Sequence, residues 1–237
     1  MAVMNWKCNP RSVSEADALA EVSDVEGVIV CPPSVFLGKV AGKLKNASLG
    51  AQNGFREEGA YTGENSFGQL KSVGAKYVIL GHSERRNMFG ETSAVVSEKV
   101  KAALSAGLVP ILCVGEKKRS GTRSAVKTVI GQLSDSIVGI PAQKVGKIVI
   151  AYEPVWAISA GGIGRNASLG EVLPVMVGIK NWISEKFGKK IKVLYGGTVL
   201  PENVAEYLSD PRVSGVLVGG ASIDKNKASK VIKNAFK

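Results

Sequence analysis

Short apolar runs alternate with longer amphipathic segments along the whole chain. Eight of the apolar runs are short and rich in β-branched residues, as buried parallel strands are. These runs are Ala2–Trp6, Gly27–Cys31, Ala47–Ala51, Tyr77–Gly81, Leu108–Val114, Lys147–Tyr152, Ile191–Tyr195 and Gly215–Val218. The pattern therefore predicts eight strands whose two faces are both covered.

Between these runs, apolar residues recur at the spacing of one helix face. The clearest predicted helices are Glu15–Val22, Val35–Leu44, Ser93–Ser105, Ala125–Ile137, Glu171–Phe187, Pro201–Leu208 and Lys225–Phe236. Ser14, Thr92 and Pro201 are expected to start three of them. The strict alternation favours parallel strands joined by right-handed helical crossovers.

The fold class expected from this order is α/β, as a single-domain, closed (β/α)8 barrel over residues 1–237. A length of 237 residues suits such a barrel, which commonly runs to about 250 residues. An open, doubly wound sheet is the alternative. We find no internal repeat, low-complexity stretch or linker, so we expect one domain.

Composition narrows the class of protein further. No apolar stretch approaches the roughly 18 residues of a membrane span, and a strand-like run follows Met1 at once, so neither a span nor a signal peptide is expected. Cys8, Cys31 and Cys113 show no paired spacing, which favours reduced core thiols in a cytoplasmic protein. Cys8 could instead be reactive, because Lys7 precedes it.

The formal net charge is +11, which would attract anionic ligands and nucleic acid. The basic residues are scattered over predicted helices and their ends, however, and no aromatic residues interleave with them. We therefore interpret them as a solvated basic surface rather than a nucleic-acid site.

One predicted strand ends on a carboxylate. Val149, Ala151 and Glu153 alternate, so they point to the same side. Pro154 biases Glu153 toward extended geometry, which holds it at the strand end. A glycine-rich stretch from residue 159 follows and has the composition of a mobile loop. A carboxylate beside such a cover suits proton abstraction, although a strand cap or an Arg partner is the alternative.

The first strand and its loop carry a cation. Alternation places Val3, Asn5 and Lys7 on one face. A lysine on an inward face is costly unless it meets an anion, and Asn5 could orient the ammonium. A surface lysine that extends to solvent is the alternative.

The only histidine of the chain, His82, lies just past the fourth apolar run, and alternation predicts that it shares a face with Leu80. A lone histidine is more often structural than catalytic. Ser83, Glu84 and two arginines follow it in the same turn, and this density of polar groups favours a functional role.

The last two predicted strands are each followed by Gly-Gly. Glycines let backbone N–H groups approach a ligand closely, and a following helix N-terminus favours an anion. In barrels of this type, these two loops recur as a phosphate site.

Taken together, these motifs resemble the triosephosphate isomerase family over nearly the whole chain. They are NWKCN (5–9), AQN (51–53), GAYTGE (59–64), GHSERR (81–86), AYEPVWAI (151–158), YGGTV (195–199) and GVLVGGAS (215–222). The resemblance implies a TIM barrel that interconverts dihydroxyacetone phosphate and D-glyceraldehyde 3-phosphate in glycolysis and gluconeogenesis, without metal or cofactor.

The resemblance also implies roles for individual residues. Glu153 would be the base, neutral His82 would polarise the carbonyl, and Lys7 would stabilise the enediolate, which are the roles known for the family. Asn5 would help position these groups and Glu84 would hold Lys7. The amides expected to carry the substrate phosphate are those of Ser159, Thr198, Gly219 and Gly220.

The sequence departs from the family in the lid. Residues 159–168 are richer in glycine than the usual lid, and the stretch from Trp156 to Trp182 is a few residues longer than usual. Ser159 replaces a glycine, and Thr198 replaces a serine. Because the extra glycines raise the entropy lost on closing, weaker retention of the substrate is expected.

The loop 52–64 appears full length. In the family this loop crosses into a neighbouring subunit, and Thr62 matches its tip. The resemblance therefore implies a two-fold homodimer. The expected ligand is a small-molecule triose phosphate, the substrate. No nucleic-acid or membrane partner is expected.

Two other functions compete with this one. Another phosphate-sugar barrel, such as an epimerase, would share the Gly-Gly loops but not the Glu153 and His82 motifs. A binding protein without catalysis would use its basic surface on nucleic acid, with salt-dependent affinity.

Overall fold

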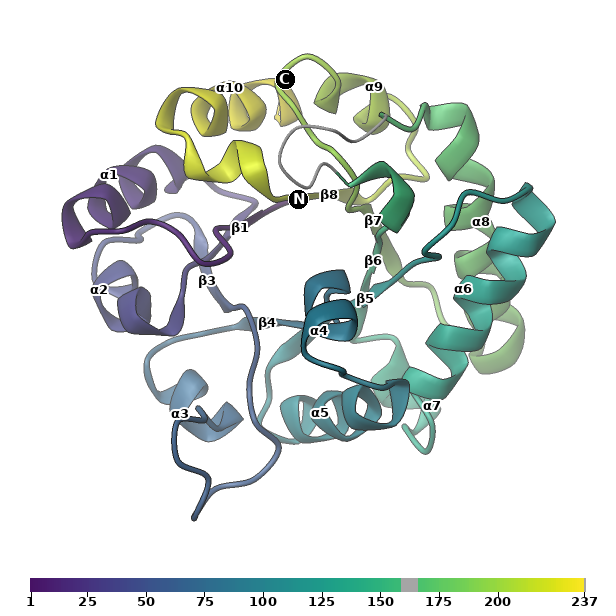
Figure 1. Cartoon of the computed structure of the whole chain (residues 1–237), viewed down its shortest axis with the longest axis horizontal. Coiled ribbons are helices and arrows are strands. Elements are labelled where there is room, and N and C mark those ends of the chain that lie inside the picture. Colours follow the sequence, from purple (N-terminus) through teal and green to yellow (C-terminus); the bar gives the residue numbers. More distant parts are fainter. Residues whose placement is uncertain (159–165, 237) are drawn as a thin grey trace.

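Eight parallel strands close into a barrel, and helices surround it in the computed structural model (Figure 1). The structure describes residues 1–158 and 166–236. The strands are β1 (Ala2–Asn5), β2 (Val28–Cys31), β3 (Ser48–Ala51), β4 (Tyr77–Leu80), β5 (Val109–Val114), β6 (Val149–Tyr152), β7 (Lys192–Tyr195) and β8 (Gly215–Val218). The predicted barrel is thereby confirmed, and the open sheet is excluded because β1 pairs with both β2 and β8.

The main helices follow the strands in the expected order. They are α1 (Val13–Ser23), α2 (Leu37–Ala41), α5 (Ser93–Ser105), α6 (Thr122–Ser136), α8 (Leu169–Phe187), α9 (Val204–Leu208) and α10 (Lys225–Ala235). Thr92 caps α5 as predicted, accepting the amide of Val95. The other two predicted starts are wrong, because Ser12 rather than Ser14 caps α1 and α9 begins only at Val204.

Further short elements lie in segments for which no helix was predicted. They are α3 (Phe67–Ser72), α4 (Ser83–Met88), α7 (Ala142–Val145) and the 3₁₀ turns η2 (Val155–Ala157) and η3 (Gly220–Ile223). A further 3₁₀ turn, η1 (Ser34–Phe36), overlaps the start of the helix predicted over Val35–Leu44. Each is too short to show the period of a helix face, so the apolar pattern could not reveal it. A capping box between Ser66 and Gln69 begins α3.

The core has two layers. One lies between the strands and the helices and includes Met4, Trp6 and Leu80. The other fills the barrel interior, and its members are Val3, Ile29, Cys31, Ile79, Ile111, Cys113, Val149, Ala151, Leu194 and Leu217. Alternate side chains of each strand therefore enter opposite layers, as the period of a strand requires.

The three thiols do not share one environment. Cys31 and Cys113 are buried as expected, but Cys8 is exposed, so the prediction that it is a core thiol is wrong. It follows the strand end, where the chain leaves the barrel.

Candidate active site

The carboxyl ends of the strands surround a cavity of about 570 Å³. Asn5, Lys7, His82 and Glu153 all line it, although they come from three distant parts of the chain. Convergence at this end of the strands is what parallel barrels provide, because every strand delivers its last residues to the same rim. The four residues selected from the sequence therefore meet in one place.

Glu153 lies at the end of β6 and is almost fully buried, with 2% of its surface exposed. Its Oε2 accepts a hydrogen bond from the amide of Ser83 at 2.9 Å. Its backbone N–H donates to the carbonyl of Val114 at 2.8 Å, which extends the β5–β6 pairing by one residue. The carboxylate is thus held inside the barrel mouth, pointing inward as the alternation with Ala151 predicted.

Gly115 is required beside this carboxylate. A Cβ at this position would stand 1.7 Å from the carbonyl oxygen of Glu153. No side chain can occupy that space, so only glycine lets β5 and β6 approach so closely here. The sequence reasoning did not select this residue.

His82 enters the cavity because the strand alternation breaks before it. Leu80 packs in the outer layer, and a histidine on the same face would point away from the cavity. Gly81 has a φ of +66°, which turns the chain, and His82 then lines the cavity as the N-terminal cap of α4. The predicted shared face of Leu80 and His82 is therefore wrong, because a left-handed glycine lies between them.

The imidazole lies between the backbone of Glu84 and the carboxylate of Glu153. Its Nδ1 accepts the backbone N–H of Glu84 at 3.3 Å, which assigns the proton of the neutral ring to Nε2. Nε2 lies 3.0 Å from Oε1 of Glu153. This contact is an electrostatic one, and Oε1 accepts no hydrogen bond from the described part of the chain.

The charges of Glu153 and His82 shift the pKa values of both side chains. Burial raises the pKa of Glu153, but the attraction of His82, the Ser83 amide and the Lys7 ammonium together hold it below its ordinary value. Burial lowers the pKa of His82, whereas the carboxylates of Glu153 and Glu84 raise it, and the net pKa lies above its ordinary value. Each shift depends on the charge of the other group, so the pair titrates as a unit.

Both the ammonium group and the backbone of Lys7 are held in place by neighbouring residues. Its ammonium lies 2.7 Å from Oε1 of Glu84. Its φ is +52°, and among the described residues it is the non-glycine residue with positive φ. Such strain persists only where neighbours impose it.

Two amide side chains impose that backbone geometry. Asn5 accepts the N–H of Lys7 through Oδ1 at 3.0 Å, and Gln52 donates from Nε2 to the carbonyl of Lys7 at 2.8 Å and to that of Cys31 at 2.9 Å. Asn5 therefore positions the backbone of Lys7 rather than its ammonium. Gln52 belongs to the motif AQN, for which the sequence predicts no separate role; its place directly after a strand is the available signal.

The glycine-rich loops form the other side of the cavity. Thr198, Gly219 and Gly220 line it together with Asn166 and Lys227. The amide of Thr198 donates to the carbonyl of Ala157 at 3.2 Å, and its hydroxyl donates to the same oxygen at 2.7 Å. Ser159, the fourth residue expected at the phosphate, lies outside the described residues, as does most of the lid.

Glu116 anchors the segment that follows Glu153. Its Oε1 accepts the indole N–H of Trp156 at 2.7 Å and the hydroxyl of Tyr152 at 3.0 Å. These bonds tie η2 to the end of β5. Within the described residues no cluster of three or more His, Cys, Asp or Glu side chains is placed to hold a metal ion.

The barrel and this cavity define the class: an α/β-barrel enzyme in which a buried carboxylate, an imidazole and an ammonium line one cavity. The sequence profile of triosephosphate isomerase matches residues 1–235. The chain belongs to the triosephosphate isomerase family. No helix in the described part of the chain is both long and apolar enough to cross a bilayer.

Individual relatives match over almost their whole length. Triosephosphate isomerase from Carboxydothermus hydrogenoformans is 41% identical, with 98% of this chain and 97% of that protein covered. The one from Symbiobacterium thermophilum is 42% identical over 93% and 90%. The crystal structure of triosephosphate isomerase from Bartonella henselae superposes with a TM-score of 0.85 at 36% identity, covering 100% of this chain and 98% of that chain.

Proposed function

We propose that this chain interconverts dihydroxyacetone phosphate and D-glyceraldehyde 3-phosphate with Glu153 as the base that moves the proton. The reaction follows from membership of the triosephosphate isomerase family. The observation that supports the residue roles is that Glu153, His82 and Lys7 line one cavity of about 570 Å³. This volume suits a small ligand that is held on several sides.

The base and the imidazole divide the proton transfers. The carboxylate of Glu153 removes a proton from C1 of the ketone, and the electrons of that C–H bond form the C1=C2 bond of an enediolate. The Nε2–H of His82 stabilises the negative oxygen and then exchanges protons between the two oxygens. Glu153 returns its proton to C2, which leaves the carbonyl on C1.

The tautomer of His82 suits this role. The amide of Glu84 donates to Nδ1 and favours a neutral ring, since a protonated Nδ1 would lose that bond. When Glu153 turns toward a substrate carbon, the charge that contributes most to raising the His82 pKa moves away. A positioned base contributes roughly 10²–10⁴-fold and an oxyanion donor roughly 10²–10³-fold.

Lys7 attracts the anionic substrate and stabilises the enediolate, with Asn5 and Glu84 holding it in place. The amides of Thr198, Gly219 and Gly220 form the phosphate cradle. Because the Thr198 amide donates to Ala157, a phosphate at this amide replaces that bond. Binding the phosphate far from the reacting carbons orients the substrate and directs binding energy to the chemical step.

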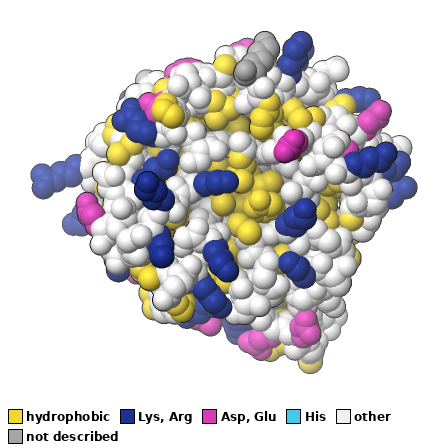
Figure 2. Space-filling model, turned by 180° about the vertical axis from the view of Figure 1, so that it is seen from behind, with side chains coloured by type: hydrophobic (Ala, Val, Ile, Leu, Met, Phe, Trp, Pro, Cys, Tyr) yellow, Lys and Arg dark blue, Asp and Glu magenta, His cyan; other side chains and the backbone are white. Residues whose placement is uncertain are grey.

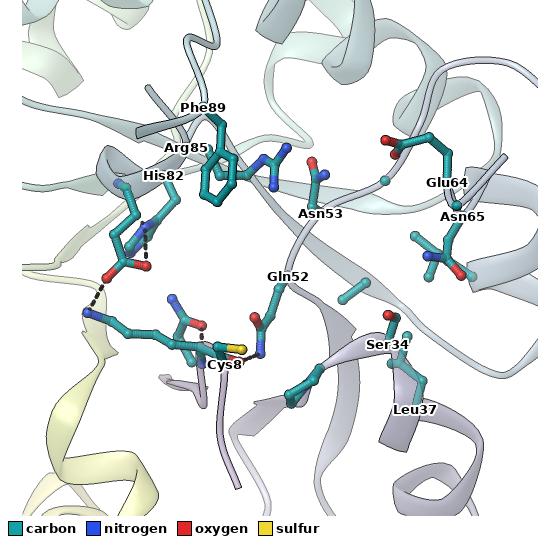
Figure 3. Close-up of a pocket in the computed structure, with 18 residues that line it drawn as sticks. Cys8, Ser34, Leu37, Gln52, Asn53, Glu64, Asn65, His82, Arg85 and Phe89 are labelled. Atoms are coloured by element: carbon teal, nitrogen blue, oxygen red, sulfur yellow. Dashed lines mark hydrogen bonds and ion pairs between the residues drawn. The ribbon is translucent and has the colours of Figure 1, made fainter. Parts of the chain in front are cut away.

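We also propose a homodimer formed through loop 52–64. A second cavity, of about 400 Å³, adjoins the first and shares Asn5, Lys7 and His82 with it. Figure 3 shows Ser34, Gln52, Arg85 and Phe89 around this cavity. A hollow of mixed polar and apolar lining beside Lys7 suits the tip of a loop from a second copy, which would complete the wall of the site.

The loop itself has the features of an interface element. It projects from the barrel between β3 and α3 (Figure 1), and Thr62 at its tip is exposed. Phe89, which lines the cavity, is exposed, and so are Met88 and Val35, each of which adjoins a lining residue in the sequence. Covering such apolar surface is a common cause of dimerisation.

We further propose that residues 1–237 form one domain, because β8 pairs with β1 to close the barrel. The membership of the family in glycolysis and the three unpaired thiols support a cytoplasmic location. A coupled assay with each triose phosphate tests the activity. Absence of turnover, together with salt-dependent binding to duplex DNA, would favour the binding-protein alternative instead.

A further inference from the structure

A third cavity, of about 450 Å³, lies at the opposite end of the barrel from the catalytic residues. Tyr77, Val109, Val149 and Lys192 line it, and each is the first residue of its strand, from β4 to β7. The carboxyl ends of the same strands carry the active site, so the length of the barrel separates the two cavities.

The floor of this cavity is apolar. Met1, Tyr77 and Val109 line it and pack, only partly buried, against the side chains that fill the barrel interior. Figure 2 shows this end of the molecule, with hydrophobic side chains gathered at the centre of the face. The interior column of the barrel therefore reaches the surface here and leaves apolar area open to water.

The rim of the cavity is cationic. Lys147, Lys190 and Lys192 line it, all three are exposed, and no Asp or Glu is among the described residues that do so. None of the three forms an ion pair with a described residue. Several lysine or arginine side chains surround the apolar centre in Figure 2.

Three cations without counter-ions repel one another and raise the local potential. Lys101 on α5, by contrast, has the carboxylate of Glu98 as its partner. An unpaired cationic rim beside an open apolar floor is complementary to a ligand with an anionic group and an apolar chain.

We propose that this cavity, which we call the basal cavity, binds an organic anion with an apolar chain, such as a medium-chain carboxylate or alkyl phosphate. The chain covers Met1, Tyr77 and Val109, and the anion lies among Lys147, Lys190 and Lys192. A free inorganic anion would leave the apolar floor uncovered. Duplex nucleic acid has no apolar segment that could enter the hollow.

The test is a calorimetric titration of the full chain with decanoate below its micelle concentration. Saturable binding of one decanoate per chain is expected, with weaker binding of 1-decanol and of inorganic phosphate. The variant Lys147→Ala/Lys190→Ala/Lys192→Ala should bind decanoate at least tenfold more weakly and keep the isomerase activity of the wild type.

A matched variant controls for overall charge. Lys225→Ala/Lys230→Ala/Lys233→Ala removes the same number of charges from the exposed face of α10, outside the basal cavity. It should bind decanoate like the wild type. Because isomerase turnover is measured separately, failure of this proposal is distinguishable from failure of the catalytic one.

Several outcomes would overturn the proposal. These are absence of saturable decanoate binding, equal loss in the two triple variants, or decanol binding as tightly as decanoate. Binding of duplex DNA that is lost only in the basal-cavity variant, without decanoate binding, would assign this face to nucleic acid.

Discussion

Nε2 of His82 lies 3.0 Å from Oε1 of Glu153, and the two side chains come from strands that are not neighbours in the barrel. Oε2 of the same carboxylate is held by the Ser83 amide at 2.9 Å. One oxygen is thus fixed by the turn after β4, while the other accepts no hydrogen bond from the described residues. A carboxylate held at one oxygen can rotate toward a substrate carbon without losing several bonds.

Replacing Glu153 should abolish most of the activity without unfolding the protein. Glu153→Gln keeps the shape but cannot accept a proton, so kcat should fall by roughly 10²–10⁴-fold. Glu153→Asp keeps the charge but withdraws it from the substrate and should also lose most of kcat, with KM less affected. Steady-state kinetics in both directions measure the effect. Circular dichroism should show native folding, and a Glu153→Gln enzyme with near-normal kcat would exclude Glu153 as the base.

The pH profile should report the coupling between His82 and Glu153. The pKa of Glu153 is held below its ordinary value, so the acid limb of kcat/KM should lie below the ordinary pKa of a glutamate. In His82→Gln the imidazole is absent and burial, the largest influence on Glu153, should dominate. The acid limb should therefore move to higher pH, and kcat should fall about 10²–10³-fold.

The same shifts predict how stability responds to pH. The contribution of Glu153 is present above its unfolded pKa and is lost as the pH falls through its lowered folded pKa. The contribution of His82 is present below its unfolded pKa and is lost as the pH rises through its raised folded pKa. Chemical unfolding of wild type and His82→Gln from acidic to neutral pH checks the direction of these changes in unfolding free energy. An acid limb of kcat/KM at the same pH in His82→Gln and wild type would contradict the coupling.

Removing the cation at position 7 should weaken both binding and catalysis. Lys7→Met keeps a long side chain and the same cost of positive φ, so the backbone has no new reason to move. We expect kcat/KM to fall about 10²–10³-fold and its dependence on salt to decrease. Lys225→Met, which removes one charge from α10, is the control and should behave like the wild type. Equal salt dependence in the two variants would exclude Lys7 as the attracting cation.

A bulky charge at the tip of loop 52–64 should prevent dimer formation. Thr62→Arg adds a cation where a partner's Lys7 and Arg85 would face it across the second cavity. Light scattering should show a monomer, and kcat should fall because the wall of the catalytic site is incomplete. Thr122→Arg, at the exposed start of α6, should leave the dimer intact. A wild-type monomer with full activity would remove the dimer proposal.

A buried ion cluster beneath this loop should matter more for stability than a surface pair. Glu91 accepts from Arg85 and Lys99, both at 2.5 Å, and Lys99 also donates to Asn53 at 3.0 Å. Glu91→Gln leaves two cations without their counter-charge, which should cost about 3–5 kcal/mol of unfolding free energy.

The exposed pair of Glu98 and Lys101 provides the control for the Glu91 variant. Glu98→Gln should change the unfolding free energy by less than about 1 kcal/mol. Burial raises the pKa of Glu91, but its two cations lower it overall. Its contribution should therefore be lost as the pH falls through the lowered pKa. Equal destabilisation by the two variants in urea unfolding would show that burial of the cluster adds nothing.

The strand order and the inward direction of Glu153 could be derived from the sequence. Eight β-branched runs separated by helical spacing correspond to a closed barrel, and each predicted strand lies within two residues of its observed bounds. Glu153 could be placed because the alternation of β6 continues unbroken to Pro154. Periodicity also failed where elements were short, as in α4, whose six residues contain too few turns to display a face.

The sequence by itself determined the barrel and the family, and it selected the residues that we propose to react, because periodicity and motif order can be read without coordinates. Tertiary structure decided how those groups are aimed. Gly81, in a left-handed conformation, turns His82 into the cavity. Asn5 and Gln52 hydrogen-bond to the backbone of Lys7. The basal cavity forms where the first residues of four strands meet. The physical reason is that a backbone angle and a contact between distant segments are properties of the closed barrel, which no local pattern of residues encodes.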